Sequence, residues 1–401
     1  MARVRRSLAT IVLLLVLVAA GHAATLPLAV RLTQALAVPG NSKSDSAAVV
    51  VDLATGRLLF ARNPDLPLAP ASNEKLTVTF AALQELGVTY RFRTEIFGRG
   101  YQDGSTWHGD LFLKGFGDPT LTSLQIERLA TQIAERGITH VTGRVLGDES
   151  WFDDRRTAVG WKSTFFINQC PPLSALIVDR AVYEHHVALQ PALAAAGRLR
   201  QLLAKHGVST GAAGLGRAPA GALALAQVES EPLPAVLQEM DRESDNFTAE
   251  LLTKELGAEV GAGGTTAAGV AIVRRDLTRL GVPLAGVRMV DGSGLSLDDR
   301  LTARALSTLL VSMWDDPDLH QPFWAALAVA GVNGTLEHRM QHRPAREAVR
   351  AKTGTTDEAS ALSGYVGRRF AFVVLQNGSP VATRPAEHAE DRFATVLASA
   401  L

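Results

Sequence analysis

The sequence predicts an α+β fold, because paired strands and amphipathic helices both occur along the chain. Near the start, Ala47 to Asp52 and Arg57 to Ala61 are apolar runs joined by a short turn with a glycine, which predicts a hairpin. Ser72 to Gly87 has apolar residues at helical spacing and ends on a glycine, which predicts a helix. Near the end, Ala361 to Val366 and Ala371 to Leu375 predict two more strands.

The middle of the chain has a different pattern. Short alternating runs from Arg91 to about Gly147, with a helix at Leu124 to Arg136, predict a β-rich subdomain. We expect a helix at Ala192 to His206 and a connector in the Gly/Ala-rich residues 210–224. Helical patterns follow at Glu231 to Gly257, Gly264 to Leu280, Ala303 to Met313 and, after Pro385, Ala386 to Ser399.

Composition limits the class of protein. The chain has 401 residues, 40 basic and 40 acidic, and 47% of its residues are hydrophobic, which is ordinary for a globular protein of two or three domains. The balanced charge, without a basic run interleaved with aromatics, argues against a nucleic-acid partner. Cys170 is the only cysteine. Pro171 and Pro172 follow it with no histidine nearby, so we expect a buried apolar side chain rather than a nucleophile.

Residues 1–23 predict a secretory signal peptide. Arg3, Arg5 and Arg6 precede an apolar stretch from Leu8 to Ala20, and small residues end at Ala23. This stretch is short of the roughly 20 residues that span a bilayer, so we expect cleavage and no stable membrane anchor afterwards. Cleavage removes three basic residues, leaving 37 against 40 acidic ones, a mildly acidic mature chain. The expected location is the periplasm or the extracytoplasmic cell envelope.

The first candidate site is the Ser72-Asn73-Glu74-Lys75 sequence. On a helix, residues three apart lie on one face, so the Ser72 hydroxyl and the Lys75 amine come within reach of each other. A lysine can activate a serine only when its pKa falls from about 10.4 toward neutrality, which requires burial or a second cation. Taken alone, the pattern is more typical of a helix N-cap serine followed by an exposed lysine.

Two further motifs favour the catalytic interpretation. Ser244-Asp245-Asn246 and Lys352-Thr353-Gly354, followed by Thr355, each occur once, and their order after Ser72-x-x-Lys75 is that of serine acyl transferases which recognise penicillin. Ser244 can relay a proton to a leaving nitrogen, and Asn246 can hold a substrate amide. Lys352 can bind a substrate carboxylate and lower the pKa of Lys75. The small Gly354 would let a substrate lie along the strand edge.

These motifs make the chain resemble the D-alanyl-D-alanine carboxypeptidase/endopeptidase family, the class C low-molecular-mass penicillin-binding proteins. The resemblance covers nearly all of the mature sequence. Supporting segments are Leu113 to Leu121, Gly143 to Asp153, Asp291 to Ser296, Gly331 to Leu336 and Ala351 to Val366. It implies a penicillin-recognising serine transpeptidase-like fold, with a five-stranded antiparallel sheet flanked by helices, a helical lobe and an inserted subdomain. The implied domains are residues 24–90 with 226–401, carrying the site, and residues 91–225, inserted.

The resemblance also implies the site and its chemistry. Ser72 would be the acylated nucleophile, Lys75 the general base and Ser244, with Asn246, the second element. Lys352 and Thr355 would bind the terminal carboxylate, with Thr353 and Gly354 beside them, and backbone N–H groups of Ser72 and Thr355 would form the oxyanion hole. The implied activity is a serine-type D-Ala-D-Ala carboxypeptidase acting on peptidoglycan stem peptides, with β-lactam antibiotics as acylating inhibitors.

One departure from the family concerns the insertion. The stretch between the first two motifs is shorter than family members commonly have, so we expect one inserted subdomain, with a second reduced or absent. This puts the endopeptidase side of the family's activity in doubt. Neither the His185-His186 pair nor His338 and His342 forms a His-Glu-x-x-His pattern, so we expect no metal, and no cofactor is implied.

Two other functions stay open. A β-lactamase would use the same motifs and deacylate fast, although no Glu-x-x-Leu-Asn run lies between the first two motifs. A non-catalytic envelope protein could use the cleft to bind cell-wall peptides, although every motif residue is present. Turnover of β-lactams would distinguish the first, and a Ser72→Ala protein that behaves like the parent would favour the second.

Overall fold

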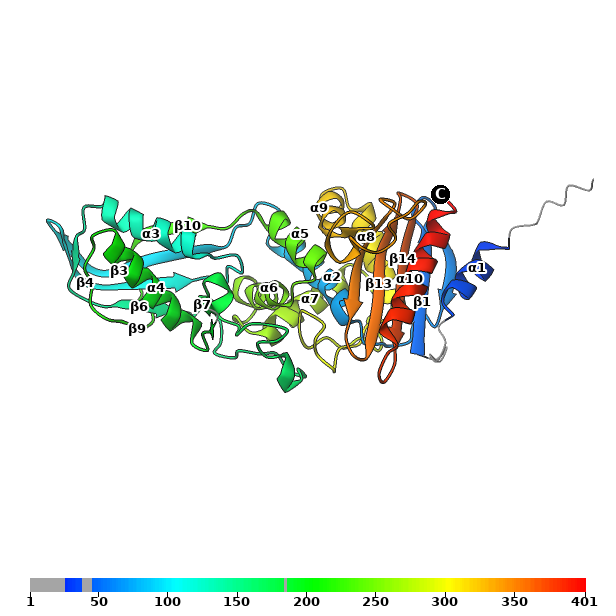
Figure 1. The fold of residues 1–401 in the computed structure, drawn as a ribbon, viewed down its shortest axis with the longest axis horizontal. Coiled ribbons are helices and arrows are strands. Elements are labelled where there is room, and N and C mark those ends of the chain that lie inside the picture. The colour runs from blue at the N-terminus through cyan, green and yellow to red at the C-terminus, as the bar shows by residue number, and fades with distance from the viewer. Residues whose placement is uncertain (1–25, 38–44, 184–185) are drawn as a thin grey trace, which may run out of the picture.

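The computed structural model describes residues 26–37, 45–183 and 186–401, so the predicted signal peptide lies outside the described residues. The molecule is elongated, with a large sheet and its helices at one end and a second sheet at the other (Figure 1). A group of helices lies between the two sheets. This arrangement confirms the predicted α+β class.

The main sheet has the strand order β11-β12-β13-β14-β1-β2, and every neighbouring pair is antiparallel. Its strands are β1 (Ser46–Asp52), β2 (Leu58–Arg62), β11 (Ala328–Val329), β12 (Val349–Thr355), β13 (Ala359–Val366) and β14 (Phe370–Asn377). The predicted hairpin and both predicted C-terminal strands are present. The implied five strands are joined by a sixth, the two-residue β11, which pairs with Ala351 and Arg350 at the edge.

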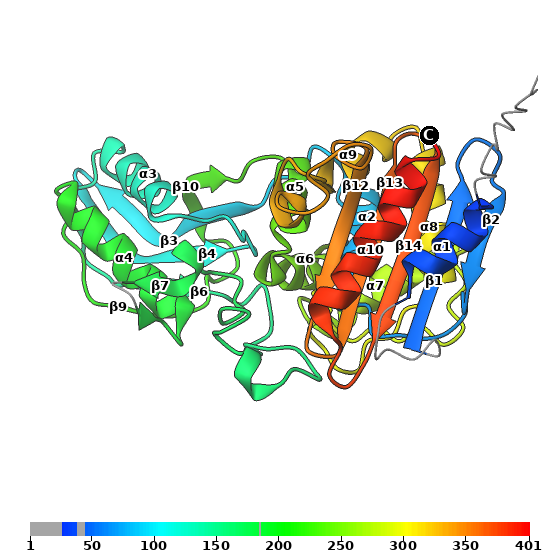
Figure 2. The same ribbon diagram turned by 45° about the vertical axis from the view of Figure 1, so that its right-hand side comes forward.

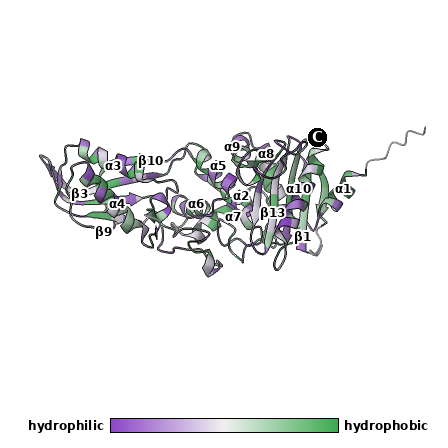
Figure 3. Ribbon diagram, in the orientation of Figure 1, coloured by the Kyte–Doolittle hydropathy of each residue, from purple (hydrophilic) through white to green (hydrophobic). Residues whose placement is uncertain are grey.

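Helices cover both faces of this sheet (Figure 2). On one face lie α1 (Leu28–Ala35) and α10 (Thr383–Ala398), and on the other α2 (Lys75–Glu85) and α8 (Ala303–Asp315). Because strand side chains alternate between faces, Val50 belongs to the same buried cluster as Phe393 of α10, whereas Val49 belongs to that of Leu306 of α8. Figure 3 shows hydrophobic residues along the strands, as two covered faces require.

The helical lobe contains α5 (Leu233–Glu243), α6 (Asn246–Glu259), α7 (Thr266–Arg279) and α9 (His320–Ala326). The prediction of one helix over 231–257 is wrong, because the chain breaks at Ser244. This residue has the left-handed φ of 59°, and the Asp245 side chain then caps α6 by accepting from the backbone N–H of Thr248 at 3.0 Å. An Asp followed by Asn favours a new helix start over a continued helix.

The second sheet has the order β10-β3-β4-β6-β9, with β5 beside β4. Its strands are β3 (Arg93–Asp103), β4 (Thr106–Gly115), β5 (His140–Val141), β6 (Val145–Asp148), β9 (Ala213–Leu215) and β10 (Leu223–Glu229). The helices α3 (Ser123–Glu135) and α4 (Pro191–Lys205) pack on it. They provide the crossovers that allow β4, β6 and β9 to pair in parallel.

The prediction that residues 210–224 form only a connector is wrong, because β9 pairs with β6 there. Gly211, just before β9, must be a glycine, because a β-carbon added there would lie 2.6 Å from the carbonyl oxygen of Gly143. The predicted domain boundaries stay a prediction. Strand β10 runs through the boundary proposed between residues 225 and 226, and a small hairpin of β7 (Val182–Tyr183) and β8 (His186–Val187) lies within the insertion.

Candidate active site

The first motif lies where the 3-10 turn η2 (Ala71–Glu74) runs directly into α2. The amine Nζ of Lys75 donates to Ser72 Oγ at 2.8 Å. In a 3-10 turn, side chains three residues apart lie one above the other, so the local backbone brings these two groups together. Helix α2 itself therefore begins at Lys75 rather than at Ser72, where the sequence pattern predicts it.

Lys75 is completely buried, and this burial lowers the pKa of its amine from 10.5 to about 8. Besides Ser72, the amine donates to Asn246 Oδ1 at 2.8 Å and to the carbonyl oxygen of Ser293 at 2.7 Å. Nearby acidic groups act against the lowering of the pKa; they are Asp291, Asp245, Asp241 and Glu250. The result is an amine much closer to its neutral form at physiological pH than an exposed lysine.

The break between α5 and α6 carries the second motif. The left-handed turn at Ser244 directs its hydroxyl to Lys352, whose Nζ donates to Ser244 Oγ at 2.8 Å. Two residues on, Asn246 opens α6, contacts Lys75 through Oδ1 and donates from Nδ2 to the carbonyl oxygen of Gln169 at 3.1 Å. Ser244 and Asn246 thus contact different lysines.

The third motif lies on β12 beside η2. Lys352 is completely buried, and burial together with repulsion from Lys75 lowers the pKa of its amine to about 7. Its Nζ also donates to the carbonyl oxygen of Thr353 at 2.8 Å, and the Thr353 hydroxyl donates to that of Thr335 at 2.7 Å. Thr355 is exposed where the strand ends, and its hydroxyl donates to Glu387 Oε1 at 3.5 Å.

The absence of a side chain at Gly354 allows η2 to approach β12. A β-carbon added there would lie 2.9 Å from the carbonyl oxygen of Pro70 and 3.0 Å from Asn73 Nδ2. Asn73 Nδ2 in turn donates to the carbonyl oxygen of Lys352 at 3.2 Å. Gly354 therefore fixes the distance between the first and third motifs, a role that sequence reasoning did not foresee.

Sequence reasoning missed two further site residues. Ser293 supplies the carbonyl oxygen that accepts from Lys75, although the Asp291 to Ser296 segment already matched the family. Asp241 lies one turn before Ser244 on α5, is completely buried, and accepts from the hydroxyl of Thr79 on α2 at 2.7 Å. Its other oxygen, Oδ1, has no hydrogen-bond partner within the described part of the chain. No motif marked Asp241, because its importance comes from its burial.

A cluster of buried acids lies behind Lys75. Burial and the nearby Asp291 raise the pKa of Glu250 to about 8 and that of Asp299 to about 12, and burial raises the pKa of Glu74 well above its ordinary value. Glu250 and Asp299 therefore hold their protons near neutral pH. Of the acids that oppose the lowering of the Lys75 pKa, Glu250 thus contributes less than an ionised carboxylate would.

The inserted segment borders the site. Arg180 forms an ion pair with Asp245, with Nη1 3.1 Å from Oδ2, and Gln169 receives the hydrogen bond from Asn246. Cys170 is completely buried in an apolar cluster with Phe152 and Phe247, and burial raises the pKa of its thiol. Its predicted role as a buried apolar side chain is confirmed.

The described residues contain neither a candidate metal-binding group nor a helix that could span a membrane. Among residues 26–37, 45–183 and 186–401, no three His, Cys, Asp or Glu side chains form a group that could hold a metal ion. In the same ranges, every helix is too short or too polar to cross a membrane.

A serine beside a buried lysine, with a second serine beside a second buried lysine, is an arrangement that is able to carry out serine acyl transfer. The sequence matches the D-Ala-D-Ala carboxypeptidase 3 (S13) family over residues 28–192 and 187–399. The chain belongs to this family. The predicted family, the fold and the activity of a D-Ala-D-Ala carboxypeptidase are thereby confirmed.

Characterised relatives support this assignment. A D-alanyl-D-alanine carboxypeptidase of an Actinomadura species is 31% identical over 83% of this chain and 78% of its own length. A carboxypeptidase of Mycobacterium tuberculosis is 31% identical over 88% of this chain and 81% of its own length. Among solved structures, penicillin binding protein 4 of Haemophilus influenzae superposes with a TM-score of 0.82 at 22% identity, covering 93% of this chain and 98% of that chain. The same protein has been solved with a bound β-lactam.

Proposed function

We propose that Ser72 is the nucleophile of this carboxypeptidase and Lys75 its general base. The observation that carries the proposal is the contact of 2.8 Å between a half-buried serine hydroxyl and a fully buried amine whose pKa is about 8. A neutral amine can accept the hydroxyl proton as the oxygen attacks a carbonyl carbon. Ser72 Oγ then forms an ester with the acyl group of the substrate.

The pair of lysines explains how one amine stays neutral while the other stays charged. Burial lowers the pKa of both amines, and repulsion from Lys75 lowers that of Lys352 further, so together they release a proton well below the ordinary lysine pKa of 10.5. A substrate carboxylate beside Lys352 stabilises the remaining proton there. Lys75 is then the amine that is free to act as a base.

The other motif residues complete the reaction. Ser244, held by Lys352, passes a proton to the leaving amine, while Asn246 holds the substrate amide. Thr355, with Thr353 and Gly354 beside it, receives the terminal carboxylate together with Lys352, and the backbone N–H groups of Ser72 and Thr355 stabilise the oxyanion. Water then attacks the ester, which releases the shortened peptide and restores the serine hydroxyl.

The substrate class we propose is peptidoglycan stem peptides ending in D-Ala-D-Ala. Attack on the carbonyl between the two alanines breaks that peptide bond and releases the terminal D-Ala. β-Lactams would acylate Ser72 because they resemble this substrate, and the bound β-lactam in the Haemophilus influenzae homologue supports this. We also propose export to the periplasm or cell envelope, cleavage of residues 1–23, and an inserted subdomain of residues 91–225, which has its own sheet and apolar cluster.

Intact-protein mass spectrometry after brief exposure to benzylpenicillin tests the proposal, with Ser72→Ala beside the parent. A one-to-one adduct on the parent alone, together with D-Ala release from a stem pentapeptide, is the expected result. If no adduct forms and the penicillin stays intact, a peptide-binding protein without catalysis is favoured. If no adduct forms and the penicillin is hydrolysed faster than roughly once per second, the protein is a β-lactamase.

A further inference from the structure

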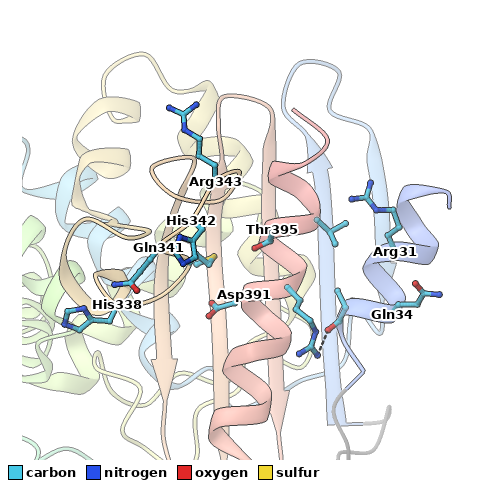
Figure 4. A pocket seen from close by; sticks show the side chains of 12 residues that line it. Arg31, Gln34, His338, Gln341, His342, Arg343, Asp391 and Thr395 are labelled. Carbon is cyan, nitrogen blue, oxygen red and sulfur yellow. Dashed lines mark hydrogen bonds between the residues drawn. The ribbon is translucent and has the colours of Figure 1, made fainter. Parts of the chain in front are cut away.

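A cavity of about 760 Å³ lies on the α1 and α10 side of the main sheet, where no proposed catalytic residue contributes to its wall. It extends over α10, with α1 on one side and the loop of residues 338–343 on the other (Figure 4). Ser72 and Lys75 belong to elements on the opposite face of the sheet. The volume is within the range of roughly 300 to 1,000 Å³ that small-molecule sites occupy.

The charged side chains around this cavity are mostly basic. Arg31 of α1, Arg343 and the two histidines of the loop, and Arg392 of α10 line it. Among residues that the structure describes, the side chains of Arg31 and Arg343 have no hydrogen-bond or ion-pair partner within the protein. Arg392 donates from Nη2 to the carbonyl oxygens of Ala35 and Ala37, both at 3.0 Å. Because these carbonyl groups are neutral, the positive charge of Arg392 is not balanced by them.

The acidic side chain in the lining does not balance these charges. Asp391 accepts from Arg339, with Oδ1 2.9 Å from Nε and 2.8 Å from Nη2, and Arg339 also contacts the buried Glu390 at 3.0 Å. Its negative charge is therefore already paired. Three arginines and two histidines consequently line the cavity, with no free carboxylate among the lining residues.

The rest of the wall is made of the polar residues Gln34, Gln341 and Thr395 and of three apolar residues. Ala35 of α1 and Val396 of α10, with Met340 of the loop, contribute to the lining, and Ala35 is buried while the other two are half-buried. A cavity with unpaired cations and an aliphatic wall matches a ligand with both an anion and an aliphatic chain. Arginine in particular offers several N–H donors arranged to fit the oxygens of a phosphate.

We propose that this cavity binds an alkyl or prenyl phosphate monoester, with the phosphate among the arginines and the chain against Ala35 and Val396. The ligand is one molecule that lies in the open cavity between α1, α10 and the loop. The same chemistry can come from a soluble ester or from a membrane lipid, and the experiment separates these sources. The site is independent of the proposed reaction at Ser72.

Isothermal titration calorimetry of the mature chain with octyl phosphate, below its micelle concentration, tests the proposal. The test variant is Arg31→Gln/Arg343→Gln, and the matched control Arg57→Gln/Arg128→Gln removes two exposed arginines elsewhere. We expect saturable one-to-one binding by the parent, weakened roughly tenfold or more in the test variant and less than about twofold in the control. A second variant, Val396→Trp, fills the apolar part and should abolish binding. Thermal melting of each variant checks that it is folded.

Several results would overturn the proposal. These are no saturable binding by the parent, equal loss in the control variant, or full binding by folded Val396→Trp. Inorganic phosphate that binds as tightly as octyl phosphate would mean that the apolar wall contributes nothing. Retention on vesicles of phosphatidylcholine mixed with phosphatidic acid, whose headgroup is a phosphate monoester, without binding of octyl phosphate would show a bilayer surface contact instead. Binding of octyl phosphate without vesicle retention supports a soluble ester as the ligand, and both together support a membrane lipid.

Discussion

Replacing Asp241 by Asn should move the pH profile of acylation toward lower pH. Asp241 is a buried carboxyl whose negative charge favours the protonated forms of both Lys75 and Lys352. The substitution removes that charge but keeps an oxygen that can accept from the hydroxyl of Thr79. We expect Asp241 to act through the two lysines, by raising their pKa values, without contact with the substrate.

The magnitude follows from the pKa values. With its pKa lowered from 10.5 to about 8, Lys75 is neutral in about one molecule in ten at pH 7, against about one in 3,000 for an exposed lysine. The proposed mechanism needs exactly one proton on the lysine pair, so the rate should fall on both sides of a maximum between about pH 7 and pH 8. Loss of one nearby buried charge should shift the alkaline limb down by roughly one pH unit.

The acid limb should move less than the alkaline limb. Burial raises the pKa of Asp241 to about 6, so in the parent this carboxyl is itself losing its charge as the pH falls through that range. Below about pH 6 parent and variant should therefore converge. The difference between the two limbs separates an effect of charge from a general loss of activity.

The assay is the second-order rate constant for acylation by benzylpenicillin, measured by quenched mass spectrometry from about pH 5 to pH 10. Glu231→Gln, which neutralises an exposed acid just before α5, is the matched control and should leave the profile unchanged. An alkaline limb that stays in place or moves to higher pH in Asp241→Asn would refute the reasoning. So would the same shift in the control.

Two further predictions concern packing and stability. Gly354→Ala should slow acylation at least roughly tenfold, because the added carbon would lie 2.9 Å from the carbonyl oxygen of Pro70 and displace η2. The melting temperature of the inserted subdomain should change little. An unchanged rate constant for acylation would contradict this prediction. The parent should lose stability as the pH rises from about 5 to about 8, because the buried Glu250 must give up its proton. Glu250→Gln should make this loss smaller by on the order of 3 kcal/mol. The folded-state pKa of about 8 lies above the ordinary 4.5, so this contribution is complete below about pH 4 and is lost as pH rises through 8. Denaturant unfolding at the two pH values measures it, and a parent that is more stable at pH 8 would contradict the assigned direction.

The candidate site could be predicted largely from sequence because its residues fall in three short motifs. Spacing alone placed the hydroxyl of Ser72 near the amine of Lys75, and the local 3-10 turn produces that contact. The contacts of Ser244 and Asn246 with lysines on other elements could not be derived in this way. They depend on the left-handed break between α5 and α6, where the periodic pattern favoured one continuous helix.

Elements with long, periodic patterns were predicted well, and short elements that exist only through pairing were not. β11 and β9 are two and three residues long, too short to show alternation, and each forms because a neighbouring strand offers its edge. Asp241 was missed for a related reason. An acid on the apolar face of a helix has no motif, and its burial depends on α2 and β12, which are distant in sequence.

The sequence by itself determined the family, the α+β class and the chemical groups available for acyl transfer, because these follow from residue types at fixed short spacing. The tertiary structure alone decided which state those groups occupy. Burying two lysines against each other lowers both pKa values, and the packing of η2 against Gly354 of β12 sets their separation. Desolvation and electrostatic repulsion depend on distances in space, which a linear pattern does not contain.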